Sequence, residues 1–229
     1  MKTITAKLEA PVRINKYLSD QGFVSRRKAD DFIKQDLVSI NGKSVTLGTK
    51  VKDGDIVTIS LPEKEYTYAL YVKPRGEVTG RIPEIPNCEP VGRLDKDSEG
   101  LIFYTDDFRV VDALLNPKHA REKEYDVVVR EKATPRVVTL LKQGIYTQET
   151  TYSPVKSVRI YNEGHSIKII LTEGKKHEIR RMLNALNLTI VSLRRIRIMS
   201  FVIHGLATKK VHILTKKQKE LLLKELNIT

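Results

Sequence analysis

A short polar segment around Leu61-Pro62 most constrains how this chain can fold, because it separates two stretches with different hydrophobic patterns. Residues 61–66 read "LPEKEY", and this proline followed by charges breaks both the helical period and the alternation of a strand. At 229 residues, the chain is long enough for a small domain followed by a medium one. The sequence therefore predicts two domains, residues 1–61 and 66–229.

The first stretch has the pattern of two helices, a hairpin and a closing strand. Residues 12–19 suit a short helix with one buried side, and Ser25 is a good N-cap for a second helix over "RRKADDFIKQ". The dipeptide Asn41-Gly42 lies between two short extended runs and is a strong hairpin signal. Alternating apolar residues then predict a strand over residues 51–59.

Three cations crowd the first turn of the second predicted helix. Arg26, Arg27 and Lys28 oppose the helix dipole, so local stability does not explain them, whereas an anionic ligand does. The alternative is an ordinary solvated basic face. The whole chain carries 41 Lys and Arg against 28 Asp and Glu, a formal charge of +13, which favours a polyanionic partner.

Residues 11–60 resemble the small RNA-binding module, of the alpha-L type, that is named for the fourth protein of the small ribosomal subunit. The resemblance rests on "V-x-I-N-G-K" at residues 38–43 and "K-x-G-D-x-V" at residues 52–57. It implies that basic side chains of this module contact RNA phosphates, which position RNA without reading much sequence. These side chains are Arg13, Lys16, Arg26, Arg27, Lys28 and Lys43.

The second stretch alternates strand-like and helix-like runs. Apolar runs typical of strands occupy residues 67–72, 100–105, 125–130, 153–160, 165–171 and 189–199. Helical periodicity occupies residues 107–115, 134–143, 177–187 and 216–226. Because few connections have a regular βαβ spacing and several strand pairs suit hairpins, the sequence predicts an α+β domain with a mixed, mainly antiparallel sheet flanked by helices.

An acidic run, "GRLDKDSEGLIFYTDD" at residues 92–107, contrasts with the basic remainder of the chain. One interpretation is a calcium loop, since Asp95, Asp97, Glu99 and Asp106 fall on EF-hand positions 1, 3, 5 and 12. Position 12 normally needs a glutamate, and Pro90 and Gly92 disfavour the entering helix. The sequence thus favours a second interpretation, in which only one carboxylate is functional.

In this second interpretation, Asp95 acts alone. A carboxylate that reacts at neutral pH must stay ionised while it is partly desolvated, and a nearby arginine favours the charged form. The best partner lies in "EGKKHEIRRML", where Ile179, Met182 and Leu183 form the apolar stripe of a helix and Arg180 lies at its edge. The alternative for this segment is an exposed basic helix face.

Almost the whole chain resembles the RNA pseudouridine synthases, specifically the RsuA-like branch that modifies ribosomal RNA and carries the same N-terminal module. The most specific motif is "VGRLDKDSEGLIFYT" at residues 91–105. The others agree with it in order and spacing: "YVKPRG" at 71–76, "EKEYDV" at 122–127, "GKKHEIRRM" at 174–182 and "LRRIRIMSF" at 193–201.

The resemblance implies a role for each residue of these motifs. Asp95 is expected to be the catalytic aspartate, Arg180 its salt-bridge partner, and Tyr125 the ring that stacks on the target base, although a tyrosine in "YDVVV" is more often an ordinary core residue. Substrate contacts or pocket walls are expected from Arg93, Ile179, Arg181 and Lys73 with Pro74.

The implied reaction is isomerisation of a uridine in ribosomal RNA to pseudouridine, which requires neither a cofactor nor a metal. The rival hypothesis is a non-catalytic RNA-binding or ribosome-assembly protein on the same fold. The start "MKTITAKLEA" has no apolar core of a signal peptide, and the single cysteine, Cys88, cannot form an internal disulfide. We expect a cytoplasmic monomer with no membrane association.

Three features depart from the family pattern. The segment between Gly76 and Val91 is short, Glu178 stands where many relatives have glutamine, and His212 stands where arginine is common. The other histidines, including His177, lack the spacing of a metal cluster and are expected at the surface or facing RNA.

Overall fold

The computed structural model describes residues 1–60, 65–147 and 150–228, which divide into two compact units. The N-terminal unit comprises residues 1–66 with 107–112, and the larger unit comprises residues 67–106 with 113–229. Leu61-Pro62, the predicted boundary, lies outside the described residues. The domain limits 1–61 and 66–229 therefore stay a prediction.

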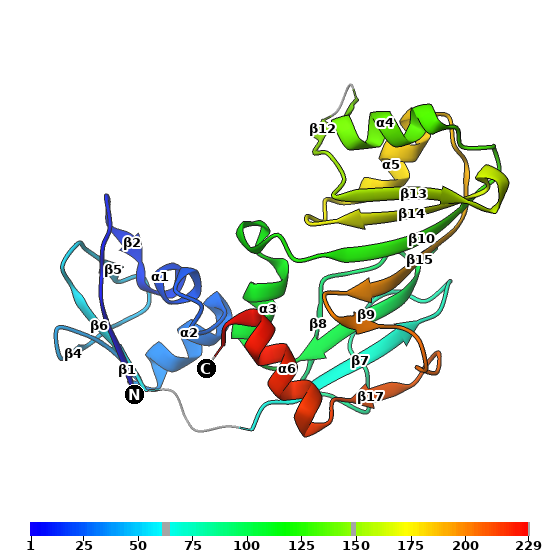
Figure 1. The fold of residues 1–229 in the computed structure, drawn as a ribbon. Helices are drawn as coiled ribbons and strands as arrows, with labels where there is room; N and C mark the ends of the chain where they lie inside the picture. The colour runs from blue at the N-terminus through cyan, green and yellow to red at the C-terminus, as the bar shows by residue number, and fades with distance from the viewer. Residues whose placement is uncertain (61–64, 148–149, 229) are drawn as a thin grey trace. The chain divides into compact units, whose positions relative to one another are not determined.

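The N-terminal unit joins two helices to a small antiparallel sheet, in the order that the sequence predicts (Figure 1). The helices are α1 (Ile14–Asp20) and α2 (Arg26–Lys34). The strands are β1 (Lys2–Thr5), β2 (Val12–Arg13), β3 (Val38–Ile40), β4 (Lys43–Ser44), β5 (Lys50–Val51) and β6 (Ile56–Ile59). The sheet order is β1-β6-β3-β4, with β2 and β5 paired separately. Strand β1 is an addition that the sequence did not predict.

Capping and turn chemistry explain these elements. Ser25 caps α2, since its side chain accepts a hydrogen bond from the Lys28 backbone N–H at 3.3 Å. Asn41 and Gly42 have φ of 51° and 76°, the left-handed conformations that a tight hairpin between β3 and β4 requires. Asn41 also accepts a hydrogen bond from the Ile56 N–H at 2.8 Å, so the turn is tied to β6.

The larger unit is built on a mixed sheet in the order β13-β14-β10-β15-β9-β7-β17. Its main strands are β7 (Tyr68–Lys73), β9 (Glu99–Thr105), β10 (Lys123–Val129), β13 (Ser157–Tyr161), β14 (Ser166–Leu171), β15 (Ile190–Ile198) and β17 (Val211–Ile213). Short strands are β8 (Glu89–Val91) on β9, β16 (Phe201–Val202) on β15, and the pair β11 (Ile145–Tyr146) and β12 (Thr151–Tyr152). Only β9 and β15 pair in parallel among the described strands of this sheet, so the predicted α+β fold class is confirmed.

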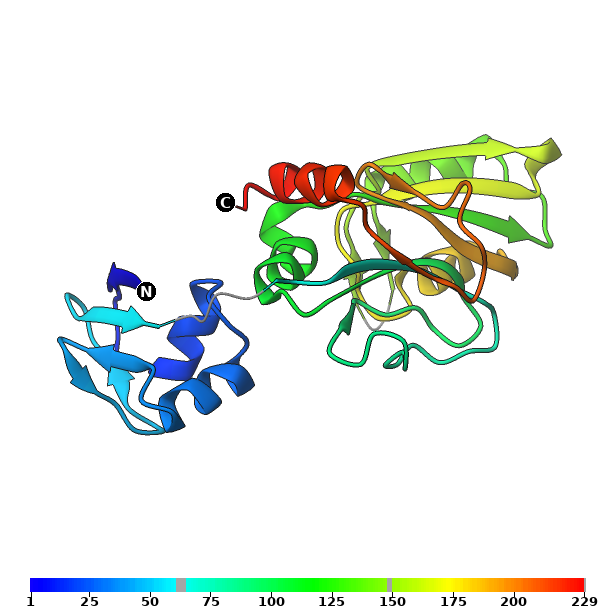
Figure 2. The same ribbon diagram turned by 90° about the horizontal axis from the view of Figure 1, so that it is seen from below.

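Helices flank this sheet (Figure 1). They are α3 (Phe108–Leu115), which contributes residues to both units, α4 (Pro135–Gln143), α5 (Glu178–Ala185) and α6 (Lys216–Leu226), with short 3-10 turns at Pro117–His119 and Asn162–Gly164. Figure 2 shows α6 on one side of the sheet, with α5 and the loops that follow β7 on the other.

Two sequence expectations are wrong in the larger unit. The apolar run at 153–160 is not one strand, because β12 ends at Tyr152 and β13 begins at Ser157, with Pro154 between them. The calcium-loop interpretation fails because strand β8 stands where an EF-hand needs its entering helix, and β9 begins at Glu99 inside the proposed loop.

Within residues 1–60, 65–147 and 150–228, no helix has the length and apolar character needed to cross a membrane.

Candidate active site

A cavity of about 680 Å³ lies between the first turn of α5 and the sheet. It is lined by Val78 between β7 and β8, by the loop before β9, by the turn that leads into α5 with the first turn of that helix, and by strands β10, β14 and β15. The lining residues are Val78, Arg93, Leu94, Asp95, Lys96, Ser98, Tyr125, Leu171, Gly174, Lys175, Lys176, His177, Glu178, Ile179, Arg180 and Leu193. The wall is thus apolar toward the sheet and mostly cationic at the rim.

Asp95 and Arg180 meet in this cavity. The Arg180 Nε lies 3.6 Å from Asp95 Oδ2, and the Arg180 Nη2 donates a hydrogen bond to Ser98 Oγ at 2.8 Å. Ser98 is buried, whereas the side chains of Asp95 and Arg180 are 37% and 29% exposed. The carboxylate is therefore open to a ligand while its guanidinium partner is fixed from behind.

The backbone around Asp95 is held by its own hydrogen bonds. The buried hydroxyl of Thr79 donates to the Leu94 carbonyl at 2.8 Å and accepts from the Leu94 N–H at 3.1 Å. The Ser98 N–H donates to the Asp95 carbonyl at 3.0 Å, which closes a turn directly before β9. These bonds fix the direction in which Asp95 enters the cavity.

His177 also contacts Asp95, which the sequence interpretation did not foresee. Its Nε2 lies 3.3 Å from Asp95 Oδ1, whereas the Arg180 Nε lies 3.6 Å from Oδ2. His177 is the N-cap of α5 and has a left-handed conformation with φ of 55°. His177 lies close to Asp95 because the turn has this conformation, and no sequence pattern predicts it.

Tyr125 and Ile179 form the apolar wall. Tyr125 is 8% exposed and lies on β10, opposite Ile169 of β14 and Arg195 of β15. Ile179 is buried on the first turn of α5, and Leu193 of β15 completes this side. Tyr125 is thus largely buried and also borders the cavity. Its position is compatible both with an ordinary core residue and with a ring on which a base stacks.

Of the other predicted site residues in the larger unit, Arg93 lines the cavity, whereas Lys73 and Arg181 do not. Arg93 is exposed and lines the cavity rim. Lys73 is buried, and its Nζ donates to the carbonyls of Pro74 at 2.9 Å and Glu77 at 2.6 Å. It is absent from the described cavity lining. Burial lowers the pKa of Lys73, against the opposing charge of Glu77. Arg181 is exposed on α5 and is also absent from this lining.

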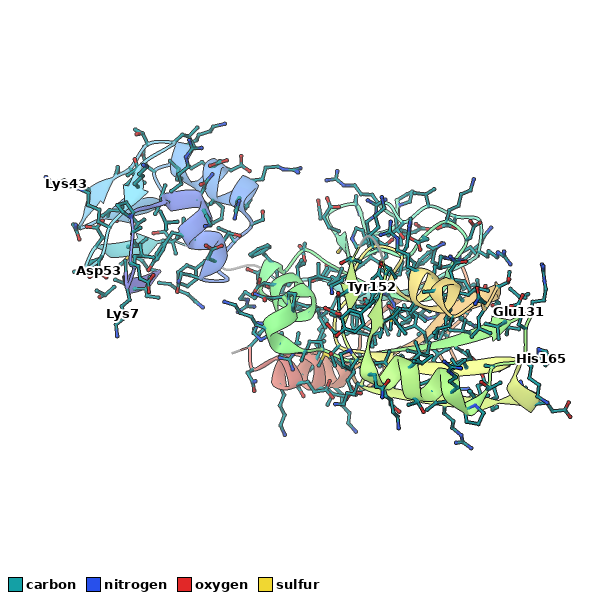
Figure 3. All side chains as sticks on the ribbon, turned by 90° about the horizontal axis from the view of Figure 1, so that it is seen from above. Lys7, Lys43, Asp53, Glu131, Tyr152 and His165 are labelled. Carbon is teal, nitrogen blue, oxygen red and sulfur yellow. The ribbon has the colours of Figure 1, made fainter. Side chains whose placement is uncertain are left out.

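The predicted phosphate contacts of the N-terminal unit are all exposed: Arg13, Lys16, Arg26, Arg27, Lys28 and Lys43. Lys43 projects from the β4 edge in Figure 3. The first turn of α2 contains no acidic residue, and its charged side chains there are Arg26, Arg27 and Lys28. The exposed cations of the unit are therefore available to a polyanion.

Glu178 is a second residue of this region whose burial the sequence analysis did not predict. It is 4% exposed, at the first position of α5, and burial raises its pKa to about 7. The helical spacing from Glu178 to Met182 already placed it on the buried side, so a signal existed.

In the described part of the chain, no three His, Cys, Asp or Glu side chains cluster closely enough to hold a metal ion. The cavity instead offers one accessible carboxylate, flanking cations and an aromatic wall. Such a combination suits an anionic ligand with a planar ring.

Two family models match the chain. Residues 12–57 match the S4 domain, and residues 76–185 match the RNA pseudouridylate synthase family. The second match contains Asp95, Tyr125 and Arg180.

Curated relatives match nearly the whole chain. The dual-specificity RNA pseudouridine synthase RluF of Escherichia coli K12 is 33% identical over 216 residues, which cover 86% of this chain and 73% of the relative. The ribosomal large subunit pseudouridine synthase B of Bacillus subtilis is 31% identical over 224 residues, covering 89% and 92%. A crystal structure of a pseudouridylate synthase has the same fold, with a TM-score of 0.68 and 24% identity over 92% of this chain and 99% of that one. The chain therefore belongs to the RNA pseudouridine synthase family, as an RNA-binding enzyme with an N-terminal S4 domain.

Proposed function

We propose that this enzyme isomerises a specific uridine of ribosomal RNA to pseudouridine, with Asp95 as the essential catalytic group. The single observation that carries the proposal is the pairing of Asp95 with Arg180 inside a cavity whose wall is Tyr125. A partly exposed carboxylate held by a fixed guanidinium stays close to a bound nucleotide, while the surrounding cations donate hydrogen bonds to its phosphates.

The target nucleotide must leave the RNA stack to reach Asp95. Extrusion costs a few kcal/mol, and least in unpaired RNA. Stacking of the base on Tyr125, at roughly 1–3 kcal/mol per base, offsets much of this cost. Arg93 and Lys96 at the rim supply positive charge beside the backbone of the flipped nucleotide.

The reaction itself is a rearrangement within the nucleotide. The bond between uracil N1 and ribose C1′ breaks, the base turns, and C5 bonds to the same C1′, while C5 loses a proton and N1 gains one. Asp95 can serve this reaction by attacking the sugar, by attacking the base, or by abstracting a ribose proton. All three routes need an ionised carboxylate beside the flipped nucleotide.

The N-terminal S4 domain contributes affinity for the RNA backbone in this proposal. Its exposed cations, above all Arg26 and Arg27, provide contacts that do not depend on base identity. Ribosomal RNA as the substrate is supported by the name of the Bacillus subtilis relative, a ribosomal large subunit pseudouridine synthase.

The substitution Asp95→Asn tests the catalytic proposal, because it keeps the shape of the side chain and removes its charge. We expect this variant to bind ribosomal RNA with the affinity of the wild type and to form no pseudouridine. Pseudouridine formation at the wild-type rate by the variant would refute the role of Asp95.

The substrate is tested by mapping pseudouridines in ribosomal RNA from cells that lack the gene. We expect one site to lose its modification, and expression of the wild type but not of Asp95→Asn to restore it. An unchanged ribosomal RNA map would refute ribosomal RNA as the substrate without bearing on the chemistry.

A further inference from the structure

Two carboxyl groups lie together behind the turn that carries His177. Glu178 begins α5, and Glu173 lies in the segment between β14 and that helix. The Glu178 Oε2 accepts a hydrogen bond from the Lys175 backbone N–H at 2.8 Å, so this carboxyl group ties together the two ends of the turn. The turn carries His177 to Asp95 and leads directly into the helical turn with Arg180.

The two carboxyl groups are hydrogen-bond neighbours, and one oxygen of each has no hydrogen-bond donor in the described structure. Glu178 is 4% exposed, the Glu173 side chain is 24% exposed, and each contacts the other. In the described part of the chain, Oε1 of each residue is buried with no hydrogen-bond partner. Ionised carboxylates only accept hydrogen bonds, so two of them in contact leave both oxygens unsatisfied and repel each other. One proton between them removes both problems.

Burial, hydrogen bonds and neighbouring charges together determine which group keeps that proton. Burial is the main factor that raises the pKa of Glu178 to about 7, and the negative charge of Glu173 adds to it. Burial also acts on Glu173, but hydrogen bonds from Ser153 and Glu178 and the charge of Lys175 outweigh it and lower the pKa of Glu173. The proton therefore resides on Glu178.

Two cations face this pair. Lys175 Nζ lies 3.5 Å from Glu173 Oε1, donates to the Thr151 carbonyl at 3.1 Å, and sits over the ring of Tyr152, the buried residue labelled in Figure 3. From β10, Lys123 also acts on Glu178; burial and then the charge of Arg195 lower the pKa of Lys123 to about 8. The cations stabilise one negative charge on the pair.

We propose that Glu178 and Glu173 share a single proton, and that this acid pair positions the turn 174–177 so that His177 and Arg180 reach Asp95. The positioning role rests on the function proposed above, whereas the shared proton does not. Glu178 acts here through the turn and is a positioning residue. Glutamine, which keeps an acceptor and adds a donor without any titration, reproduces the protonated state at this position.

The proton itself is tested without any assay of activity. Infrared difference spectra at neutral pH, recorded on the intact Asp95→Asn protein, detect the C=O stretch of a protonated carboxylic acid. We expect such a band, and we expect Glu178→Gln in the same background to remove it while Glu220→Gln on the exposed face of α6 leaves it. A missing band, or one that survives Glu178→Gln, would overturn the shared proton even if the enzyme proved inactive on every RNA offered.

The positioning role is tested by the pH profile of single-turnover pseudouridine formation. As pH rises through about 7, the wild type loses the shared proton, and we expect its rate to fall about fivefold relative to Glu178→Gln, the value of one hydrogen bond of about 1 kcal/mol. Both proteins retain His177 and Asp95, so the contributions of these two residues cancel in the ratio. Glu178→Ala, which keeps neither hydrogen bond, is expected to be slow over the whole range.

Parallel profiles of the wild type and Glu178→Gln would overturn the positioning role. Full activity of Glu178→Ala with an unchanged melting temperature would do the same. If the wild type forms no pseudouridine, the function proposed above fails and the infrared result stands on its own.

Discussion

The guanidinium of Arg180 joins the carboxylate of Asp95 to the hydroxyl of Ser98, so that Asp95 is fixed on one side by a charge that comes from a helix far along the chain. Nε approaches Asp95 and Nη2 donates to Ser98, which uses two positions of the planar guanidinium. A lysine cannot occupy both positions at once, since its ammonium is a single point charge.

Arg180→Lys therefore separates geometry from charge. We expect it to lower the rate of the chemical step about 30-fold, for a loss of about 2 kcal/mol when a partly buried pair is disrupted, while RNA affinity stays unchanged. Arg180→Ala is expected to be slower still. The measurement is single-turnover pseudouridine formation at saturating enzyme, with Arg181→Lys as the control one residue further on α5; equal losses in both lysine variants would contradict this account.

His177 combines an ion-pair distance with an unusual backbone. At φ of 55°, alanine is strained and glycine is not, so His177→Gly and His177→Ala remove the same imidazole at different cost to the turn. We expect both variants to lose the contact to Asp95 and to slow catalysis about threefold to fivefold, in line with a half-exposed pair of about 1 kcal/mol.

Their stabilities are expected to differ. Thermal unfolding should show His177→Ala less stable than His177→Gly by about 1 kcal/mol. Equal melting temperatures would mean that the left-handed turn relaxes without cost.

Elements whose form depends on local residues could be predicted from the sequence. Ser25 predicts the start of α2 and Asn41-Gly42 predicts the hairpin, because capping and positive φ are local requirements. Helical periodicity predicts α4, α5 and α6. Strand β8 was not predicted, because a proline such as Pro90 is unfavourable within a strand. Here it is tolerated because β8, among the described strands, pairs along one side only, with β9.

The site required more than local patterns. Periodicity placed Arg180 on the edge of a helix, and the need of a reactive carboxylate for a nearby arginine made it the best partner for Asp95, a pairing that the family resemblance also implied. The contact itself joins distant segments, so no local pattern encodes it. His177 was missed for a related reason: its direction depends on one left-handed residue in an exposed turn. Glu178 was noted as a departure from the family, yet its burial could be inferred only from its helical spacing.

Gly100 lies where β9 and β15 run in parallel, and it has no room for a side chain. A Cβ at this position would lie 2.2 Å from the Arg195 carbonyl oxygen and 2.6 Å from the Arg195 nitrogen, at a φ of +118°. We expect Gly100→Ala to destabilise the protein by about 3 kcal/mol or more, a fall of roughly 6–12 °C in melting temperature. Gly80→Ala, with only a backbone oxygen 4.0 Å away, is the control and should melt like the wild type.

The carboxyl pair makes stability depend on pH. The pKa of Glu178 in the folded protein, about 7, exceeds its ordinary value of 4.5, so the folded state holds a proton that the unfolded chain releases. The stability that this proton provides is present at low pH and is lost as pH rises from 4.5 to about 7. Wild type and Glu178→Gln should therefore diverge by roughly 2 kcal/mol over this interval, in urea denaturation at fixed salt. A constant difference between them would contradict the raised pKa.

Arg27 and Lys34 lie at opposite ends of α2 and allow a matched test of the RNA-binding face. Arg27 opposes the helix dipole in the first turn, and Lys34 complements it in the last, so Arg27→Ser should leave the melting temperature unchanged or raise it while Lys34→Ser lowers it slightly. If Arg27 neutralises a phosphate, Arg27→Ser should weaken RNA binding and reduce the slope of log K against log salt by about 0.7–0.9. Lys34→Ser should leave that slope unchanged. Equal slopes for Arg27→Ser and the wild type would mean that the cations at the start of α2 face solvent when RNA is bound.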